Sequence, residues 1–171
     1  LVGEIKNAVR EGSSNIYYIP RRNIILGKWL KHGGWWPDYV PRLFKKKSPF
    51  TWVGEVHESP KFEGKEGYFR NAITHLTARS IDQMLEKSIA WGQVEAKLYH
   101  RAKYPRVTIF KLIKAAAREF FSRYLQKKGF LDGTAGFIQA IYQALHQVII
   151  LVYLWEIQTS SKEKFKSATN E

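Results

Sequence analysis

The chain has 171 residues, of which 44% are hydrophobic, with a formal net charge of +13 and no cysteine. This length fits one ordinary domain with enough apolar content to bury a core. The absence of cysteine excludes a disulfide framework, thiolate metal sites and a cysteine nucleophile. Residues 1–10 lack the apolar region of a signal peptide, and because the sequence opens at Leu1 rather than Met we expect a fragment or a processed product.

The first part of the chain, to about residue 78, has the pattern of short strands broken by turns. A helix is expected over Leu1–Glu11, because Gly12 can stop it in a left-handed conformation. Strand candidates follow at Ile16–Ile19, Phe50–Val56 and Lys65–His75. We expect Pro20 to end the first of these strands.

The pattern becomes helical after residue 78. Ser80 can cap a helix that begins at Ile81 and is broken by Pro105. A second helix is expected from about Val107 to Gly129, and a third over about 135–157. The polar tail from residue 159 is expected to be disordered. The sequence therefore predicts three parts, namely residues 1–78, 79–158 and 159–171.

Most of the positive charge lies in one segment of the helical part. The segment from residue 97 to residue 128 contains one acid, Glu119, and ten basic residues. The basic residues are at positions 97, 101, 103, 106, 111, 114, 118, 123, 127 and 128. Such a field attracts phosphates of lipid headgroups, nucleotides or nucleic acids. A nucleic-acid module would show a recognisable reading helix or aromatic strand, and because neither is present we expect no nucleic-acid partner.

The third predicted helix raises the question of a membrane. Its uninterrupted apolar run, Val148–Trp155, has eight residues, far fewer than the roughly 20 that span a bilayer. Gln139, Gln143 and Gln147 form a polar stripe on the same helix. One interpretation is a helix packed on the second helix. The other is an interfacial hairpin, in which both helices lie in the headgroup region.

The segment Trp35-Trp36-Pro37-Asp38 combines two indoles with a carboxylate. Indoles that shield Asp38 from water would raise its basicity, and a carboxylate beside aromatic rings is suited to holding a sugar. The simpler interpretation is that Asp38 caps a turn while the tryptophans belong to the core.

A second set of polar residues follows on later strand ends. His57, Glu58 and His75 could together ligate Mn²⁺ or Mg²⁺, although a further carboxylate would be needed. Taken singly, each imidazole is more simply a hydrogen-bonded structural residue. Arg21, Arg22 and Arg42 are rigid forks suited to phosphate or carboxylate.

Several ordered blocks resemble the second half of bacterial family 2 glycosyltransferases, of the lipopolysaccharide-core and cell-surface glycan type. The blocks are Tyr18-Ile19-Pro20-Arg21-Arg22-Asn23, Leu26-Gly27, His32-Gly33-Gly34-Trp35-Trp36-Pro37-Asp38, Arg42-Leu43-Phe44, Gly54-Glu55-Val56-His57-Glu58, Thr74-His75-Leu76, Gly129-Phe130-Leu131-Asp132-Gly133 and Gly136-Phe137. The resemblance covers the chain to about Trp155. The order of the blocks is more specific than any single block.

The resemblance implies an α/β, more narrowly α+β, fragment. Residues 1–78 would be the acceptor-side half of a GT-A domain, and residues 79–158 a basic and apolar helical extension that associates with a membrane. The half that binds the nucleotide-sugar donor, with the acidic ligands of a divalent Mn or Mg ion, is expected upstream of residue 1. The fragment alone is therefore expected to be inactive.

The resemblance also implies roles for individual residues. Asp38 would be the general base of an inverting transfer, with Glu58 as the rival candidate. His75 and then His57 would complete metal or diphosphate binding. Arg42 or Arg21 would neutralise the leaving diphosphate, and Trp35 and Trp36 would form the floor of the acceptor site.

The implied partners are a nucleotide-sugar donor, a glycan or lipid-linked acceptor and an anionic membrane surface. The basic helix over 111–123 would dock the enzyme peripherally at the cytoplasmic face of the inner membrane. An alternative from another class is a non-enzymatic, membrane-associated module that binds anionic lipid or glycan.

Overall fold

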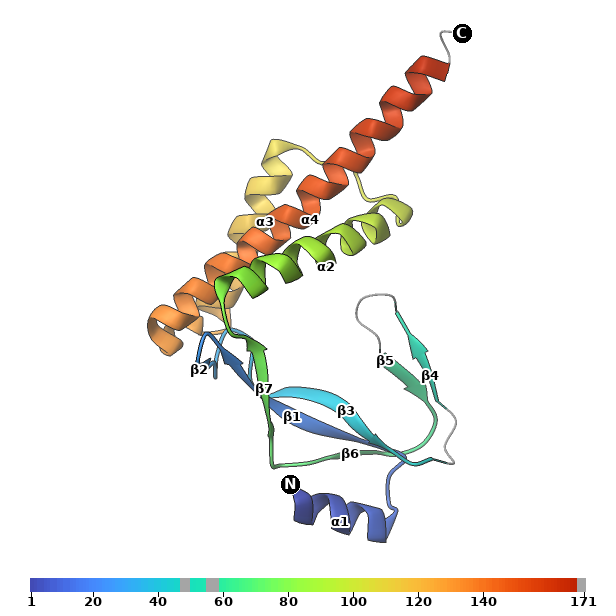
Figure 1. Ribbon diagram of the computed structural model, residues 1–171, viewed down its shortest axis with the longest axis vertical. Helices are drawn as coiled ribbons and strands as arrows, with labels where there is room; N and C mark the ends of the chain where they lie inside the picture. The colour runs from blue at the N-terminus through green and yellow to red at the C-terminus, as the bar shows by residue number, and fades with distance from the viewer. Residues whose placement is uncertain (47–49, 55–58, 169–171) are drawn as a thin grey trace. The chain divides into compact units, whose positions relative to one another are not determined.

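The computed structural model describes residues 1–46, 50–54 and 59–168, with side chains to residue 160 (Figure 1). The chain divides into two compact units, Leu1–Arg79 and Ser80–Glu171. The division falls one residue from the boundary that the sequence predicts. Each unit is described by itself.

The first unit is a small mixed sheet with one helix, α1 (Val2–Glu11). Its strands are β1 (Ile16–Ile25), β2 (Lys28–Trp29), β3 (Asp38–Phe44), β4 (Phe50–Val53), β5 (Ser59–Phe62), β6 (Glu66–Tyr68) and β7 (Ile73–Ala78). β4 and β5 pair with each other as a separate antiparallel hairpin. The predicted strand over 65–75 is in fact two strands, β6 and β7.

β1 is the central strand of the sheet, and two partners follow one another along each of its edges. β3 and β2 pair with it antiparallel, whereas β6 and β7 pair with it parallel. The prediction that Pro20 ends this strand is wrong. Pro20 pairs with Tyr39 on one side, and on the other side it falls between Tyr18, the last residue paired with β6, and Arg21, the first paired with β7. Its missing N–H therefore falls at a gap in the ladder.

α1 covers the sheet through a small apolar core. Ala8 on the helix packs with Tyr17, Ile19 and Phe69. The helix ends as the sequence predicts, because Gly12 adopts a left-handed conformation with φ 59° and its N–H donates to the carbonyl of Ala8.

The second unit is helical. It contains α2 (Ile81–Arg101), α3 (Ile109–Phe121), the π-helical turn η1 (Ser122–Gln126), the 3-10 turn η2 (Gly129–Asp132) and α4 (Gly133–Ala168). The hydroxyl oxygen of Ser80 accepts from the N–H of Gln83 at the start of α2, as the sequence predicts. Thr108 caps α3 in the same way, by accepting from the N–H of Lys111.

α4 is the helix that holds this unit together, because it packs against both α2 and α3. Leu151 and Leu154 of α4 are buried with Ala96 of α2 and with Val107, which precedes α3. The turn from η2 into α4 is tight: a Cβ atom on Gly136 would lie 1.9 Å from the carbonyl oxygen of Gly129. A glycine is therefore required at position 136.

α4 is longer than the sequence predicts. It extends to Ala168, through most of the segment expected to be a disordered tail, and the residues there include the helix formers Lys and Glu. The helical stretch Gly129–Ser160 is long and apolar enough to cross a membrane by length and composition, and 28% of its most apolar window is buried within the unit. A buried core helix meets the same criteria.

The two units give a fold of mixed helix and strand, consistent with the α+β class that the sequence predicts.

Candidate functional site

The candidate site is built around Asp38, the first residue of β3. The register places it opposite Arg21 on β1. The Nε and Nη2 atoms of Arg21 lie 2.9 and 2.7 Å from the same carboxylate oxygen, Oδ2. Both side chains are about one-quarter exposed. The ion pair between β1 and β3 is therefore partly shielded from water.

Asn23 connects this ion pair to the rest of the site. Its side chain is only 1% exposed. Its Nδ2 group donates to Asp38 Oδ2 over 2.7 Å and to the carbonyl of Trp35 over 3.3 Å. Arg21 and Asn23 are two positions apart on β1, so their side chains lie on the same face of the strand. Because both bind the same oxygen, β1 fixes the orientation of the carboxylate.

The opposite edge of β1 supplies the other partners of Asn23. Its Oδ1 atom lies 2.8 Å from Nδ1 of His75 and accepts from the hydroxyl of Thr77 over 3.0 Å, and both residues are on β7. The register that places His75 beside Asn23 brings this histidine into the network of Asp38. A buried polar network of this kind is rigid when its members are satisfied.

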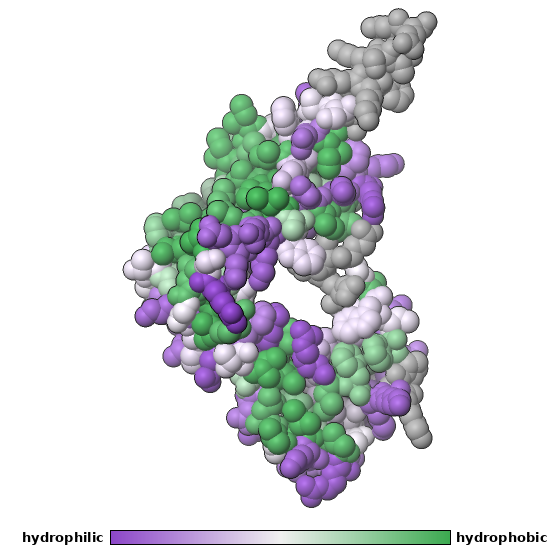
Figure 2. Space-filling model, in the orientation of Figure 1, coloured by the Kyte–Doolittle hydropathy of each residue, from purple (hydrophilic) through white to green (hydrophobic). Residues whose placement is uncertain are grey.

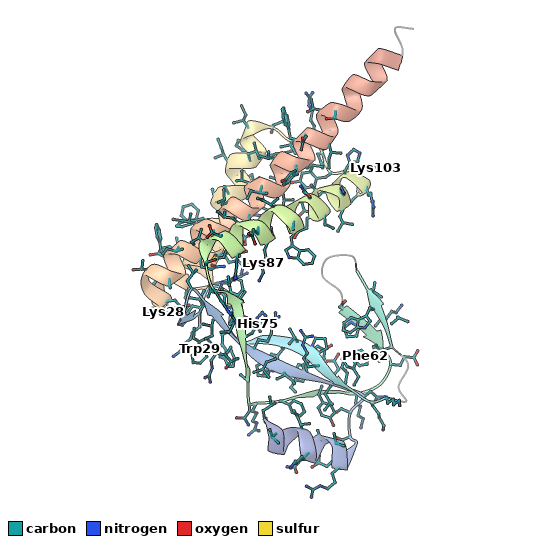
Figure 3. All side chains as sticks on the ribbon, in the orientation of Figure 1. Lys28, Trp29, Phe62, His75, Lys87 and Lys103 are labelled. Atoms are coloured by element: carbon teal, nitrogen blue, oxygen red, sulfur yellow. The ribbon has the colours of Figure 1, made fainter. Side chains whose placement is uncertain are left out.

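A group of aromatic and cationic side chains surrounds Trp29, which lies on the neighbouring strand β2. The ring of Trp36 meets the ring of Trp29 edge to face, with 5.5 Å between centroids. The guanidinium of Arg22 and the ammonium of Lys31 lie 4.4 and 4.6 Å from the centroid of Trp29. Trp29 and His75 are labelled in Figure 3. Two like charges beside one ring create a strongly positive surface.

Three tyrosines contact one another across the sheet, namely Tyr18 on β1, Tyr39 on β3 and Tyr68 on β6. The rings of Tyr18 and Tyr68 are stacked with centroids 5.1 Å apart, and Tyr39 meets Tyr68 edge to face. A hydrogen bond to Glu66 is the main cause that raises the pKa of Tyr68, while burial and then the same carboxylate raise the pKa of Tyr18. Both phenols therefore stay neutral and can act as hydrogen-bonding aromatic surfaces.

Of the residues predicted for the site, Asp38, Arg21 and His75 join one side-chain network through Asn23. Trp35 enters it through its backbone carbonyl, and the ring of Trp36 contacts Trp29. Arg42 is not, because it lies toward the far end of β3, exposed, and donates to the carbonyl of Pro41. His57 and Glu58 lie outside the described residues. Among the described residues no group of three or more His, Cys, Asp or Glu side chains could hold a metal ion.

The sequence reasoning missed Asn23, Thr77 and Trp29. Asn23 is the central member of the network, and its signal was a polar amide followed directly by the apolar pair Ile24-Ile25. Because Pro20 is expected to end the strand, the sequence does not predict Asn23 as a strand residue. Trp29 carried no signal of its own, since its role comes from the pairing of β2 with β1.

Neither protein-family models nor solved structures give a match to this chain. The functional interpretation therefore depends on the residues of the site and on their geometry.

Proposed function

We propose that the chain is the acceptor-side half of a nucleotide-sugar-dependent glycosyltransferase, of the GT-A type and working at the cytoplasmic face of the plasma membrane. The observation that carries the proposal is the carboxylate of Asp38, which Arg21 and Asn23 orient directly after the segment Trp35-Trp36-Pro37. Asn23 also binds the backbone carbonyl of Trp35. A fixed carboxylate next to aromatic rings suits a sugar, because the rings cover its C–H face and the carboxylate accepts from its hydroxyl groups.

Asp38 is proposed as the general base. Arg21 and Asn23 both bind its Oδ2 atom, and we propose that Oδ1 receives the proton of the acceptor hydroxyl. The acceptor oxygen then forms a bond to the anomeric carbon of the donor sugar while the bond from that carbon to the diphosphate breaks, which inverts the configuration. A base must be positioned before its basicity matters, and the hydrogen bonds from β1 supply that position.

The positive surface beside Trp29 favours an acceptor that carries negative charge. Arg22 and Lys31 both lie on the ring of Trp29, and that ring contacts Trp36. Residues 22–34 contain no acid. Arg22 and Trp29 share one face of the sheet, whereas Arg21, Asn23 and Asp38 share the other. We propose that this surface binds a phosphate or carboxylate group of the glycan, apart from the hydroxyl that approaches Asp38.

The proposal includes a divalent metal whose main acidic ligands are expected upstream of residue 1. The described residues do not make a metal site by themselves, and His75 already bonds to Asn23 and Thr77 through Nδ1. When bound, Mn²⁺ or Mg²⁺ would neutralise the leaving diphosphate.

Transfer of labelled sugar to a lipopolysaccharide-core acceptor tests the proposal, in the protein that also carries the donor-binding half. Asp38→Asn should lower the rate of transfer by at least about 100-fold, since a positioned base contributes roughly that much. Binding of the nucleotide-sugar should be unchanged. The matched control is Asp82→Asn, which alters an exposed acid at the start of α2.

Arg21→Gln separates a chemical role of Asp38 from a structural one. This variant removes the ion pair but leaves the carboxylate, so it should lose similar stability with a smaller loss of transfer. Equal losses of transfer in Arg21→Gln and Asp38→Asn, at equal stability, would contradict the base assignment.

The second candidate is a non-enzymatic module that binds anionic lipid or glycan. It is favoured by the exposed apolar side chains of α3, where Ile109 and Phe110 are 77% and 71% exposed. Transfer activity in the protein with its donor-binding half would exclude this candidate, and persistent inactivity with intact glycan binding would support it.

A further inference from the structure

The outer side of α3 presents apolar side chains to its surroundings. Ile109, Phe110, Ile113 and Phe121 are 77%, 71%, 63% and 53% exposed, and we call these four residues the outer face of α3. No residue of this helix is buried. Figure 2 shows hydrophobic residues gathered over this part of the helical unit. A contiguous apolar face of this kind marks a surface that meets another apolar phase.

Basic residues border this face along one side. At 100° per residue, Lys111, Lys114 and Arg118 form a row beside the apolar arc. Further cations, Lys127 and Lys128, follow at the end of η1, and both are exposed. An apolar face with a cationic border is complementary to a bilayer whose headgroups are anionic.

The packing of α4 opposes a membrane-spanning arrangement. Ala140, Ile150, Leu151 and Leu154 of α4 are each at most 1% exposed, because α2 and α3 cover them. Polar contacts also tie α4 to α2: the hydroxyl of Tyr142 donates to the carbonyl of Met84. A spanning α4 would either lose these contacts or carry the charged side chains of α2 into hydrocarbon.

We infer that the outer face of α3 lies in the headgroup region of an anionic bilayer, with the helical unit bound to one leaflet. The apolar side chains reach the acyl boundary, and Lys111, Lys114 and Arg118 meet lipid phosphates. This inference depends on the helical unit alone, so it can fail while the proposed glycosyl transfer stands, and the reverse.

Vesicle co-sedimentation of the full 171-residue chain tests the charge requirement. Binding is expected to vesicles of phosphatidylethanolamine with phosphatidylglycerol, to be weak with phosphatidylcholine alone, and to fall as salt rises. Lys114→Glu with Arg118→Glu should weaken binding roughly 30-fold. The matched control is Lys6→Glu with Lys97→Glu, which makes the same change in net charge at exposed positions of α1 and α2 and should bind far more strongly.

A single introduced cysteine locates the face, since the chain has none of its own. An environment-sensitive label at Phe110→Cys should shift to the blue with anionic vesicles, whereas the same label at Val9→Cys, also an exposed apolar position, should not. Equal, salt-resistant binding to all vesicles would overturn the inference in favour of insertion. A concentration-dependent shift without vesicles would overturn it in favour of a second copy covering the face, and the absence of any vesicle binding would also overturn it.

Discussion

The two units of the chain differ in their most distinctive feature, which is a buried polar network in the sheet unit and an exposed apolar helix face in the helical unit. The sheet unit buries the amide of Asn23 and satisfies it with four side-chain or backbone partners. The helical unit leaves large apolar residues such as Phe110 exposed. Buried polar groups are retained at a cost that satisfied hydrogen bonds offset, whereas exposed apolar faces need another apolar phase. We propose that the polar network serves recognition of a polar ligand and that the apolar face serves contact with a lipid surface.

The largest expected effect comes from removing the centre of the polar network. Asn23→Ala should destabilise the sheet unit by about 3 kcal/mol, because it leaves several buried or part-buried polar groups unpaired. Urea unfolding followed by tryptophan fluorescence measures this change, since Trp29, Trp35, Trp36 and Trp52 lie in this unit.

Asn7→Ala is the matched control for this prediction. Asn7 is exposed on α1 and accepts from Arg10. Its replacement should change the unfolding free energy by less than about 0.5 kcal/mol. Equal effects at positions 7 and 23 would contradict this prediction, because the buried network of the sheet unit would then add nothing to stability.

The next effect concerns the close turn between η2 and α4. Gly136→Ala places a methyl group 1.9 Å from the carbonyl oxygen of Gly129, so the turn must open, at a cost of about 2 kcal/mol to the helical unit. Thermal unfolding followed by helical circular dichroism measures it. Gly3→Ala is the control, because nothing lies within 4 Å of a Cβ atom there and alanine favours α1. An unchanged unfolding temperature in Gly136→Ala would contradict the close approach of Gly136 to Gly129.

A smaller effect is expected at the helix caps. Ser80→Ala and Thr108→Ala each remove an acceptor for an N–H at the start of α2 or α3, and each should lower stability by about 1 kcal/mol. Ser80→Asp and Thr108→Asp should restore it. If Thr108→Ala weakens vesicle binding as well as stability, vesicle binding depends on a well-formed α3.

The smallest effects separate the units by pH. Burial raises the pKa of Glu4, but hydrogen bonds from the backbone of Arg70 and Asn71 outweigh it, and the net pKa lies below the ordinary 4.5. The sheet unit should therefore keep this stability above pH 4.5 and lose it as the pH falls through the lowered value. Glu4→Gln should reduce this loss of stability at acid pH, which urea unfolding at several pH values measures.

The helical unit should respond at the alkaline end. Burial raises the pKa of Tyr142 above its ordinary 10.0, although the hydrogen bond with Ser88 opposes the rise. Its contribution is complete below pH 10.0 and is lost as the pH rises through the folded value. Tyr142→Phe should reduce the loss of stability at alkaline pH and leave the loss at acid pH unchanged. Equal acid and alkaline responses in both variants would contradict this assignment.

Local features of the fold could be predicted from the sequence. The glycine that stops α1, the serine that caps α2 and the three main helices depend on neighbouring residues, and these predictions are confirmed. Within the site, Asp38 with the indoles before it was also marked by sequence alone.

Non-local features could not be predicted. Pro20 is tolerated inside β1 because β6 and β7 leave a gap beside it, which depends on residues about 50 positions away. Asn23 meets His75 through the parallel pairing of β1 with β7, and Trp29 meets Trp36 only after β2 folds back on β1. Pairing register, rather than local propensity, decides these contacts.

The most direct test of the central claim is the response of the six indole N–H signals in an NMR titration of the full chain. Four tryptophans lie in the sheet unit and two, Trp91 and Trp155, in the helical unit. Lipopolysaccharide-core oligosaccharide should shift Trp35 and Trp36 and leave Trp91 and Trp155 unchanged, whereas a nucleotide-sugar should shift none of the six. A nucleotide-sugar response at Trp35 and Trp36, or no response to any core oligosaccharide, would contradict the acceptor-side assignment.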